Sequence, residues 1–161
     1  MSLVLLNLTL SCGKGFDKKS KPTTIRTQEA QEEDTFSLNQ RYLTLVNEYR
    51  IDHKLKPLTY SSIIEKVAME HAKGMATDSR GFNHRGFSLR CRKIKKRLGE
   101  HKLCGEIIAM GQKTPEAVLK AWLNSPKHME ELQQSRYNMT ALAMYKSQAG
   151  VSYWTQIFVE L

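Results

Sequence analysis

The sequence has few of the residues and motifs that define several common protein classes. It holds three cysteines and four prolines in 161 residues, which excludes a disulfide-dense scaffold and a proline-rich chain. It contains no G-x-S-x-G, P-loop, H-E-x-x-H or C-x-x-C pattern, so the common serine hydrolase, nucleotide-binding, zincin and thioredoxin classes have no support. The apolar run LVLLNLTL at residues 3–10 is too short for a bilayer span, which needs about 20 residues.

Acidic residues are also scarce relative to basic ones. Lysine and arginine total 25 against 16 aspartates and glutamates, giving a formal net charge of +9 and a pI near 9.5. The partners to consider first are therefore anionic: nucleic acid, anionic lipid or acidic glycan. A hydrophobic content of 40% is ordinary for a globular protein, and the length suits one domain.

The N-terminal run ends at Ser11-Cys12 and is followed by a polar, basic segment. This arrangement suits a secretory signal, whose apolar region spans roughly 7–15 residues. A small residue before a cysteine resembles a bacterial lipobox, which predicts that residues 1–12 are a signal peptide and that Cys12 becomes the lipidated N-terminus of an exported, membrane-anchored protein. A cleaved secreted form and a plain apolar N-terminus are the alternatives, because Leu10 is larger than usual there and no basic residue precedes the run.

Residues 13–36 have almost no large apolar side chains and cannot bury enough surface to order themselves. We interpret them as a flexible tether, with one folded domain over residues 37–161.

Cys91 and Cys104 remain if Cys12 is acylated, and in an exported protein both lie in an oxidising compartment. An even remainder suggests that they form a disulfide across the basic loop between them. Two unpaired buried thiols are the alternative, because cysteine packs well as a small hydrophobic residue.

Periodicity predicts helices first and strands last. Capping boxes at Ser37/Gln40 and Ser62/Glu65 begin two amphipathic helices, and Thr114-Pro115 begins a third that runs to about Trp122. The run GEIIAMG at 105–111 suits a buried strand, and segments 139–145 and 151–159 suit a hairpin whose turn contains Gly150. Helices interleaved with a small antiparallel sheet define an α+β class.

Six segments in this order resemble the CAP superfamily, which comprises the cysteine-rich secretory, antigen-five and pathogenesis-related proteins, and most closely its bacterial branch. No single segment is specific, but their order is. They are Val46-Asn47-Glu48-Tyr49-Arg50, Val67-Ala68-x-x-His71-Ala72, Phe82-Asn83-His84, Gly105-Glu106-Ile107-Ile108-Ala109, Trp122-x-x-Ser125-Pro126-x-His128 and Tyr153-Trp154-Thr155-Gln156.

The resemblance implies a three-layer α-β-α sandwich with a polar cleft. Eukaryotic members place two histidines and two glutamates in that cleft, where they can bind a divalent metal. Only His84 and Glu106 match this set; Ser125 stands in place of the second glutamate and Tyr153 in place of the second histidine, while His128 matches the bacterial branch. The predicted cleft residues are His84, Glu106, His128, Ser125, Tyr153 and Gln156.

Three kinds of chemistry fit His84, Glu106 and His128. Two imidazoles and a carboxylate are the ligands of an open zinc site, although the fold requires no cofactor. They also suit a hydrogen-bonded cluster in which Glu106 orients the histidines, or a metal-free acid–base site. We assign no catalytic residue, and we interpret His71, on the apolar face of its helix, as a core histidine with a backbone or carboxylate partner.

The run RGFSLRCRKIKKRLGEHK at 85–102 is the most basic part of the chain. It is either a hydrated surface or an anion-binding lip beside the cleft. Lipid headgroups suit a tethered protein, whereas the predicted export and the lack of interleaved aromatic residues make nucleic acid an unfavourable partner.

The sequence therefore predicts an extracytoplasmic binding or interaction module whose cleft takes a lipid, glycan or peptide. The alternative is a metal-dependent or acid–base hydrolase that uses the same cleft.

Overall fold

The chain is described by a computed structural model that covers residues 23–77 and 81–161, with side chains from Ser37 onward. The helices and strands of this part, in chain order, are α1 (Thr23–Asp52), β1 (Thr59–Tyr60), α2 (Ser62–Thr77), α3 (Phe87–Leu98), β2 (Leu103–Met110), α4 (Pro115–Leu123), α5 (Pro126–Gln133), β3 (Met139–Lys146) and β4 (Ser152–Glu160). The predicted α+β class is confirmed. None of the described helices combines the length and the apolar character needed to cross a membrane.

The strands form one sheet in the order β1-β3-β4-β2. The long strands β2 and β3 each pair antiparallel with β4, and the short β1 pairs parallel with β3. In the β2–β4 ladder Glu106 lies opposite Ile157. Because β2 is the last strand in this order, it forms one edge of the sheet.

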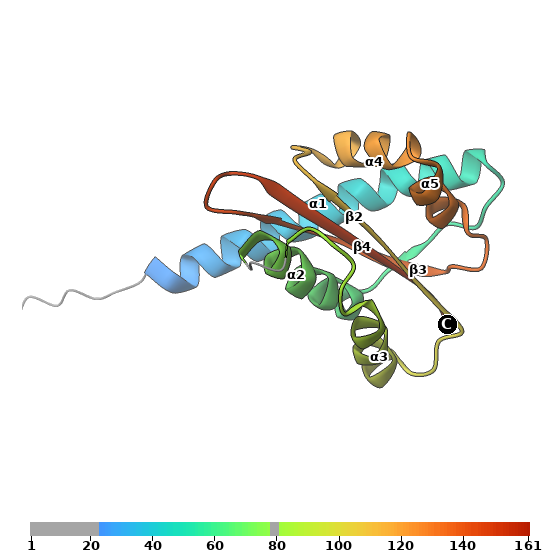
Figure 1. The fold of residues 1–161 in the computed structure, drawn as a ribbon, viewed down its shortest axis with the longest axis horizontal. Coiled ribbons are helices and arrows are strands. Elements are labelled where there is room, and N and C mark those ends of the chain that lie inside the picture. Colours follow the sequence, from blue (N-terminus) through green and yellow to red (C-terminus); the bar gives the residue numbers. More distant parts are fainter. Residues whose placement is uncertain (1–22, 78–80) are drawn as a thin grey trace, which may run out of the picture.

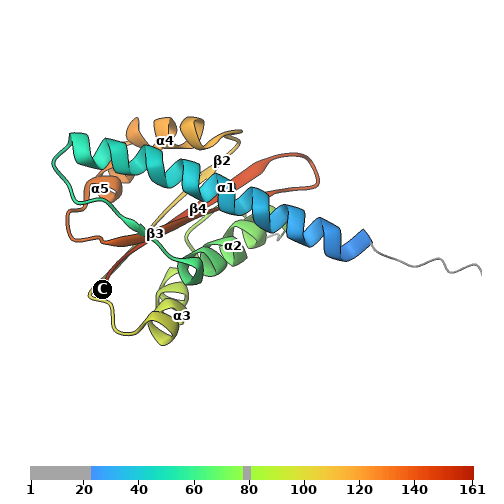
Figure 2. The ribbon, with the colours of Figure 1, turned by 180° about the vertical axis from the view of Figure 1, so that it is seen from behind.

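Helices cover both faces of this sheet, as Figures 1 and 2 show. One core contains Tyr42 of α1, Trp122 of α4 and Leu132 of α5, packed on Trp154 and Phe158 of β4. The other contains Ile64 and Val67 of α2 and Ile94 of α3, packed on Ile157 and Val159 of β4. Because neighbouring residues of a strand face opposite sides, β4 contributes alternate residues to the two cores. The predicted α-β-α sandwich is confirmed.

The first helix begins earlier than the sequence predicted. The helical backbone of α1 starts at Thr23, whereas residues 13–36 were expected to be a flexible tether. Residues 23–36 contain neither glycine nor proline, and the run Gln28 to Glu33 consists of glutamine, glutamate and one alanine, which favour helix even where no apolar face is buried. The remaining part of that predicted tether, and the predicted signal peptide with Cys12, lie outside the described residues.

The other predicted elements occur close to their expected positions, and three elements were not predicted. α2, β2, α4 and the hairpin of β3 and β4 match the sequence pattern. The sequence pattern did not predict the short strand β1 or the helices α3 and α5. The basic character of α3 hides its apolar positions: its only fully packed side chains are Arg90 and Ile94, one turn apart.

A buried arginine ties α1 to the segment after α5. Arg50 has no exposed surface, and its guanidinium donates hydrogen bonds to backbone oxygens of other segments. The acceptors are Lys56 at 2.9 Å, Leu132 at 2.7 Å, Gln134 at 3.2 Å and Tyr137 at 3.5 Å. These carbonyls include the C-terminal end of α5, where a cation is favourable. Arg50 thereby fixes α5 and the chain that leads into β3.

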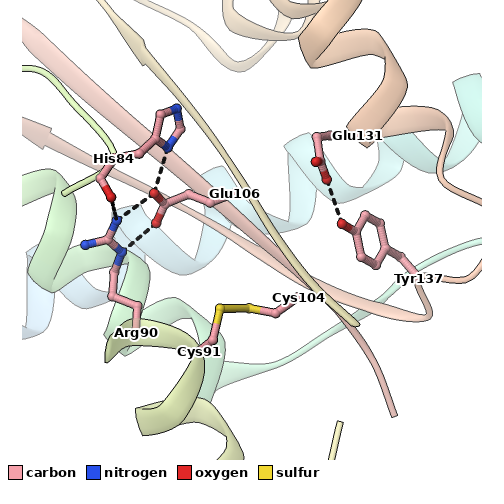
Figure 3. Close-up of a disulfide and its surroundings, with 7 residues drawn as sticks. All are labelled: His84, Arg90, Cys91, Cys104, Glu106, Glu131 and Tyr137. Atoms are coloured by element: carbon pink, nitrogen blue, oxygen red, sulfur yellow. Dashed lines mark hydrogen bonds and ion pairs between the residues drawn. A yellow bond between two sulfur atoms is a disulfide. The ribbon is translucent and has the colours of Figure 1, made fainter. Parts of the chain in front are cut away.

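Gly105 of β2 packs against the hydrogen-bonded pair of Tyr137 and Glu131. Figure 3 shows that pair. The Tyr137 hydroxyl donates to Glu131 at 2.6 Å, and the Tyr137 ring stacks on Phe158 with centroids 5.1 Å apart. A Cβ at position 105 would come closer to both Tyr137 and Glu131 than 3.0 Å. Since Tyr137 is stacked and buried, it cannot swing away, and only glycine fits here.

We therefore expect Gly105→Ala to lower the free energy of unfolding by about 2 kcal/mol, the usual effect of overpacking. Gly74→Ala is the matched control, because a Cβ in that helical position meets nothing within 4 Å. It should be neutral or stabilise the domain by about 0.5–1 kcal/mol through higher helix propensity. Urea unfolding of both variants tests this, and equal effects of the two substitutions would refute the packing argument.

Candidate functional site

A buried carboxylate on the edge strand β2 is the centre of the candidate site. The Glu106 side chain is only 1% exposed, and Arg90 of α3 donates to both of its oxygens, from Nε at 2.5 Å and from Nη2 at 2.6 Å. His84 Nδ1 lies 2.8 Å from Glu106 Oε1, and its imidazole is half exposed. Figure 3 shows His84 and Arg90 converging on Glu106 from the same side of β2. The structure therefore brings two of the predicted cleft residues into contact.

The local sequence explains how His84 and Arg90 reach this carboxylate. Asn83 accepts from the Arg85 backbone at 2.8 Å, which forms a turn, and Gly86 takes a positive φ of 82° just before α3 begins. One turn into α3, Arg90 donates back to the carbonyls of Arg85 at 2.9 Å and His84 at 3.3 Å. The arginine thus holds both the carboxylate and the loop that carries the histidine.

The charges around Glu106 decide its protonation. Burial raises the pKa of the Glu106 carboxyl, but the hydrogen bonds from His84 and Arg90 and the Arg90 charge outweigh this, and the net pKa lies below its usual value. Glu106 is therefore an anion at neutral pH. Its charge is already neutralised by Arg90, so the exposed imidazole is the group left to meet a ligand.

A second histidine borders the cluster from α2. His71 has a side chain 10% exposed, and its Nε2 lies 3.8 Å from Glu106 Oε1 without a hydrogen-bond partner in the described part of the chain. Burial lowers the pKa of His71, which outweighs the attraction of Glu106. The predicted backbone or carboxylate partner is present, because the imidazole has a backbone hydrogen bond with Asn83 and lies beside the Glu106 carboxylate, while Nε2 itself stays unbonded among the described residues.

His128 reaches this region from the opposite layer. It lies on α5 and is partly buried, and burial followed by the charge of His84 lowers its pKa. His84 and Glu106 are bonded directly, whereas the structure records no hydrogen bond from His128 to either.

Two of the other predicted cleft residues lie elsewhere. Gln156 is fully buried, accepts from the Tyr42 hydroxyl at 2.5 Å and donates to Thr140 at 3.1 Å, so its prediction as a cleft residue is wrong. Alternation along β4 turns it to the face opposite Glu106. Tyr153 lies opposite Met110, four positions along the ladder from the Glu106 pair and so roughly 13 Å away.

Ser125 is the N-cap residue of α5, three positions before His128. Its side chain makes no capping hydrogen bond. It is partly buried, and its role in the cleft stays a prediction.

The donor set does not fit the predicted zinc site of His84, Glu106 and His128. Both oxygens of Glu106 accept hydrogen bonds from Arg90, and the guanidinium charge beside them opposes a divalent cation. Within residues 23–77 and 81–161, the group of three ligand-type residues whose donor atoms all lie within 4.8 Å of one another is Cys91, His101 and Cys104 instead. We therefore derive no chemistry from a metal at Glu106.

The predicted disulfide is present between Cys91 and Cys104. Cys91 follows Arg90 in α3, and Cys104 lies two positions before Glu106 in β2, as Figure 3 shows. The bond therefore joins the two elements that carry the buried ion pair. By lowering the entropy of the unfolded chain, a disulfide that closes a loop of this length raises the free energy of unfolding by about 3 kcal/mol.

A pocket of about 260 Å³ opens beside the cluster, between α2 and α3. His71, Arg85, Leu89, Arg90 and Lys93 are among its lining residues, whereas His84, Glu106 and His128 are not. The pocket is therefore a neighbour of the predicted cleft and not the cleft itself. Arg90 and His71 line the pocket and also lie beside Glu106.

Sequence reasoning missed Arg90 as a site residue, because it lies in a run of basic residues that looked uniformly solvated. One pattern could have found it. Arg90 and Ile94 are four residues apart, which places the arginine on the apolar side of an amphipathic helix, and a cation there needs a buried anion.

Comparisons with known proteins agree with this architecture. The sequence profile of the cysteine-rich secretory protein family (CAP) matches residues 43–158. The uncharacterized protein YkwD of Bacillus subtilis is 34% identical over 121 residues, which cover 74% of this chain and 46% of that protein. The chain thus spans about half the length of the curated relative it matches.

Two solved structures are also similar. An outer surface protein from Borrelia burgdorferi has a TM-score of 0.66 and 26% identity, over 75% of this chain and 90% of that chain. An extracellular protein containing an SCP domain from Bacillus anthracis has a TM-score of 0.70 and 25% identity, over 88% of this chain and 45% of that one.

Removing one partner of the buried pair should be costly. We expect Arg90→Met to lower the free energy of unfolding by about 3–5 kcal/mol, because Glu106 is left as a buried charge. The double variant Arg90→Met/Glu106→Leu should recover much of this loss, and Arg92→Met, at an exposed position of the same helix, should stay within about 0.5 kcal/mol of the native chain. Equal stability of the single and double variants in urea unfolding would contradict the pairing.

Stability should also fall as the solution becomes acidic. The pKa values of His71 and His128 are lowered from 6.5 in the folded chain, so below that pH the unfolded chain binds more protons and the folded state loses stability. The contribution of Glu106, whose pKa is lowered from 4.5, is present above that pH and is lost as pH falls through the folded pKa. Imidazole NMR titrations check the first step; midpoints of His71 and His128 at or above 6.5 would refute it.

Proposed function

Because the chain belongs to the cysteine-rich secretory protein (CAP) family, we propose that it is an exported binding module that docks on anionic lipid headgroups through α3 and the adjoining loop. His84 borders this surface and contributes a polar contact to the bound headgroup. The proposal places the domain outside the cytoplasm, on the surface of the membrane to which its N-terminus is anchored.

Three observations support export. The similar proteins of known structure include an outer surface protein and an extracellular protein. The Cys91–Cys104 disulfide is typical of proteins that fold in an oxidising compartment. The apolar run ending at Ser11-Cys12 supports lipidation of Cys12, which lies outside the described residues.

The charge distribution supports an anionic partner. Of the basic residues between 85 and 102, Arg90 pairs with Glu106, Lys93 with Glu70 and Lys95 with Glu100. The others have no acidic partner among the described residues, and all of them are exposed: Arg85, Arg92, Lys96, Arg97 and Lys102. Each basic residue close to an anionic membrane adds about 1 kcal/mol to binding, so this surface is sufficient for stable adsorption when combined with a lipid anchor.

The observation that carries the proposal is the half-exposed imidazole of His84, which directly precedes the unpaired, exposed Arg85. Its Nδ1 is bonded to Glu106, and half of its side chain remains exposed. A fixed, exposed imidazole can donate or accept one hydrogen bond from a headgroup. In the described part of the chain, no serine, threonine or cysteine hydrogen-bonds to His84, so the usual activated nucleophile is not assembled there.

Acid–base hydrolysis is the second candidate, and the His84–Glu106 hydrogen bond favours it. A carboxylate bonded to one ring nitrogen orients an imidazole for proton transfer by the other. Arg90 weakens this arrangement because it neutralises the carboxylate. Steady turnover of a model ester or peptide that is lost in a folded His84→Ala variant would establish this function instead.

Vesicle sedimentation tests the binding proposal. The full chain carrying Cys12→Ser, which cannot be lipidated, should bind vesicles containing phosphatidylglycerol and not vesicles of phosphatidylcholine, with affinity falling as salt rises. Replacing Arg92, Lys96 and Arg97 together with alanine should weaken binding on the order of 100-fold, from about 1 kcal/mol per residue.

The matched control replaces Lys113, Lys120 and Lys127, which are exposed around α4 and α5 on the other layer. It removes the same formal charge and should leave binding nearly unchanged. Equal losses in both triple variants would mean that net charge alone drives binding. Preference for a soluble sulfated polysaccharide or an acidic peptide over the vesicles would replace lipid as the partner.

A further inference from the structure

A cluster of soft metal ligands lies beside the candidate site and plays no part in the function proposed above. Cys91 of α3, Cys104 of β2 and His101 of the connecting loop each offer one ligand atom, and these atoms all lie within 4.8 Å of one another. All three residues are partly buried. The two sulfurs are bonded to each other as a disulfide, so His101 is the residue whose environment can indicate a ligand site.

His101 has a ring nitrogen that the fold does not otherwise use. Its Nδ1 is buried and has no hydrogen-bond partner in the described part of the chain. Buried polar atoms normally have a partner, so an imidazole that lies next to two sulfurs and keeps one buried nitrogen unpartnered indicates a position built for a ligand. Charge supports the same conclusion: thiolates would be favoured in this part of the chain, which is rich in lysine and arginine.

We propose that Cys91, Cys104 and His101 form a zinc-type metal site when the disulfide is reduced. Two thiolates and one imidazole, with water as the fourth ligand, are an established tetrahedral zinc set. Thiolate sulfurs around one zinc ion lie about 3.8 Å apart, given zinc–sulfur distances of about 2.3 Å. The three ligand atoms already lie within 4.8 Å of one another, so opening the disulfide leaves them close enough to converge on one ion.

The chemistry balances with a thiol reductant. Two reductant thiols break the Cys91–Cys104 bond, giving two protein thiols and one reductant disulfide. A divalent zinc ion then binds both sulfurs as thiolates and releases two protons to solvent. Oxidation by a disulfide oxidant reverses the sequence and expels the metal, so the metal-bound form and the disulfide form exclude each other.

Either state links α3 to β2 at the same place. Arg90 and Glu106 are the neighbours of this link, so a metal in the reduced chain keeps the buried ion pair together in the absence of the covalent bond. In a newly made chain that is still reduced, a metal at this site would therefore join α3 to β2 before the disulfide forms.

Cobalt binding to the reduced chain tests the proposal. The full chain carrying Cys12→Ser, reduced with a phosphine under anaerobic conditions, should bind one Co²⁺ with thiolate-to-cobalt charge-transfer bands and tetrahedral d–d bands, and Zn²⁺ should displace it. Loss of even an outer-shell partner weakens metal sites about 10–100-fold, so His101→Ala should weaken Co²⁺ binding by about tenfold or more. His53→Ala, at an exposed position at the end of α1, is the control and should have no effect.

A second measurement does not depend on the spectrum. Zn²⁺ should slow the return of the disulfide in the presence of oxidised glutathione, and it should do so less in His101→Ala. The proposal is overturned if the reduced chain binds Co²⁺ no more tightly than a Cys91→Ser/Cys104→Ser chain, or if His101→Ala and His53→Ala behave alike. Vesicle binding by the oxidised chain is unaffected by any of these outcomes.

Discussion

The buried ion pair of Glu106 and Arg90 is the interaction on which the rest of the candidate site depends. A carboxylate with 1% exposure would be strongly unfavourable on an edge strand, and the guanidinium offsets that cost with two charge-assisted hydrogen bonds. The same guanidinium holds the carbonyls of His84 and Arg85. The residues that lead directly into α3 are thereby held, and the hydrogen bond to Glu106 orients the exposed imidazole of His84.

The surrounding fold supports this pair from both sides of the sheet. On one side the Cys91–Cys104 disulfide ties α3 to β2 next to the pair. On the other side Gly105 allows Tyr137 and Glu131 to approach the backbone of β2, while Arg50 secures the end of α5. The edge strand is thus held by contacts to both helical layers, and the position of Glu106 follows from the whole domain.

This arrangement is the basis for proposing a binding role in place of a catalytic one. General acid–base catalysis needs an imidazole or carboxylate that can exchange a proton, and covalent catalysis also needs a nucleophile within hydrogen-bond reach. Here Arg90 neutralises the carboxylate, and the described structure bonds no hydroxyl or thiol to His84. Our proposal of an anionic ligand rests on the half-exposed imidazole and on the unpaired basic residues between 85 and 102.

The sequence by itself determined the class of fold and most of its helices and strands. It suggested the pairing of Cys91 with Cys104, with unpaired thiols as the alternative, and its order of motifs implied that His84 and Glu106 share a cleft. These features follow from local periodicity, capping residues and the order of short motifs, all of which are properties of neighbouring residues. Tertiary structure alone decided that Arg90 is buried against Glu106, that His71 adjoins it and that Gln156 faces the opposite core. The physical reason is that a charge in a basic run, or an amide on a strand, looks the same in sequence whether it meets water or a buried partner, and the packing of distant segments chooses between them.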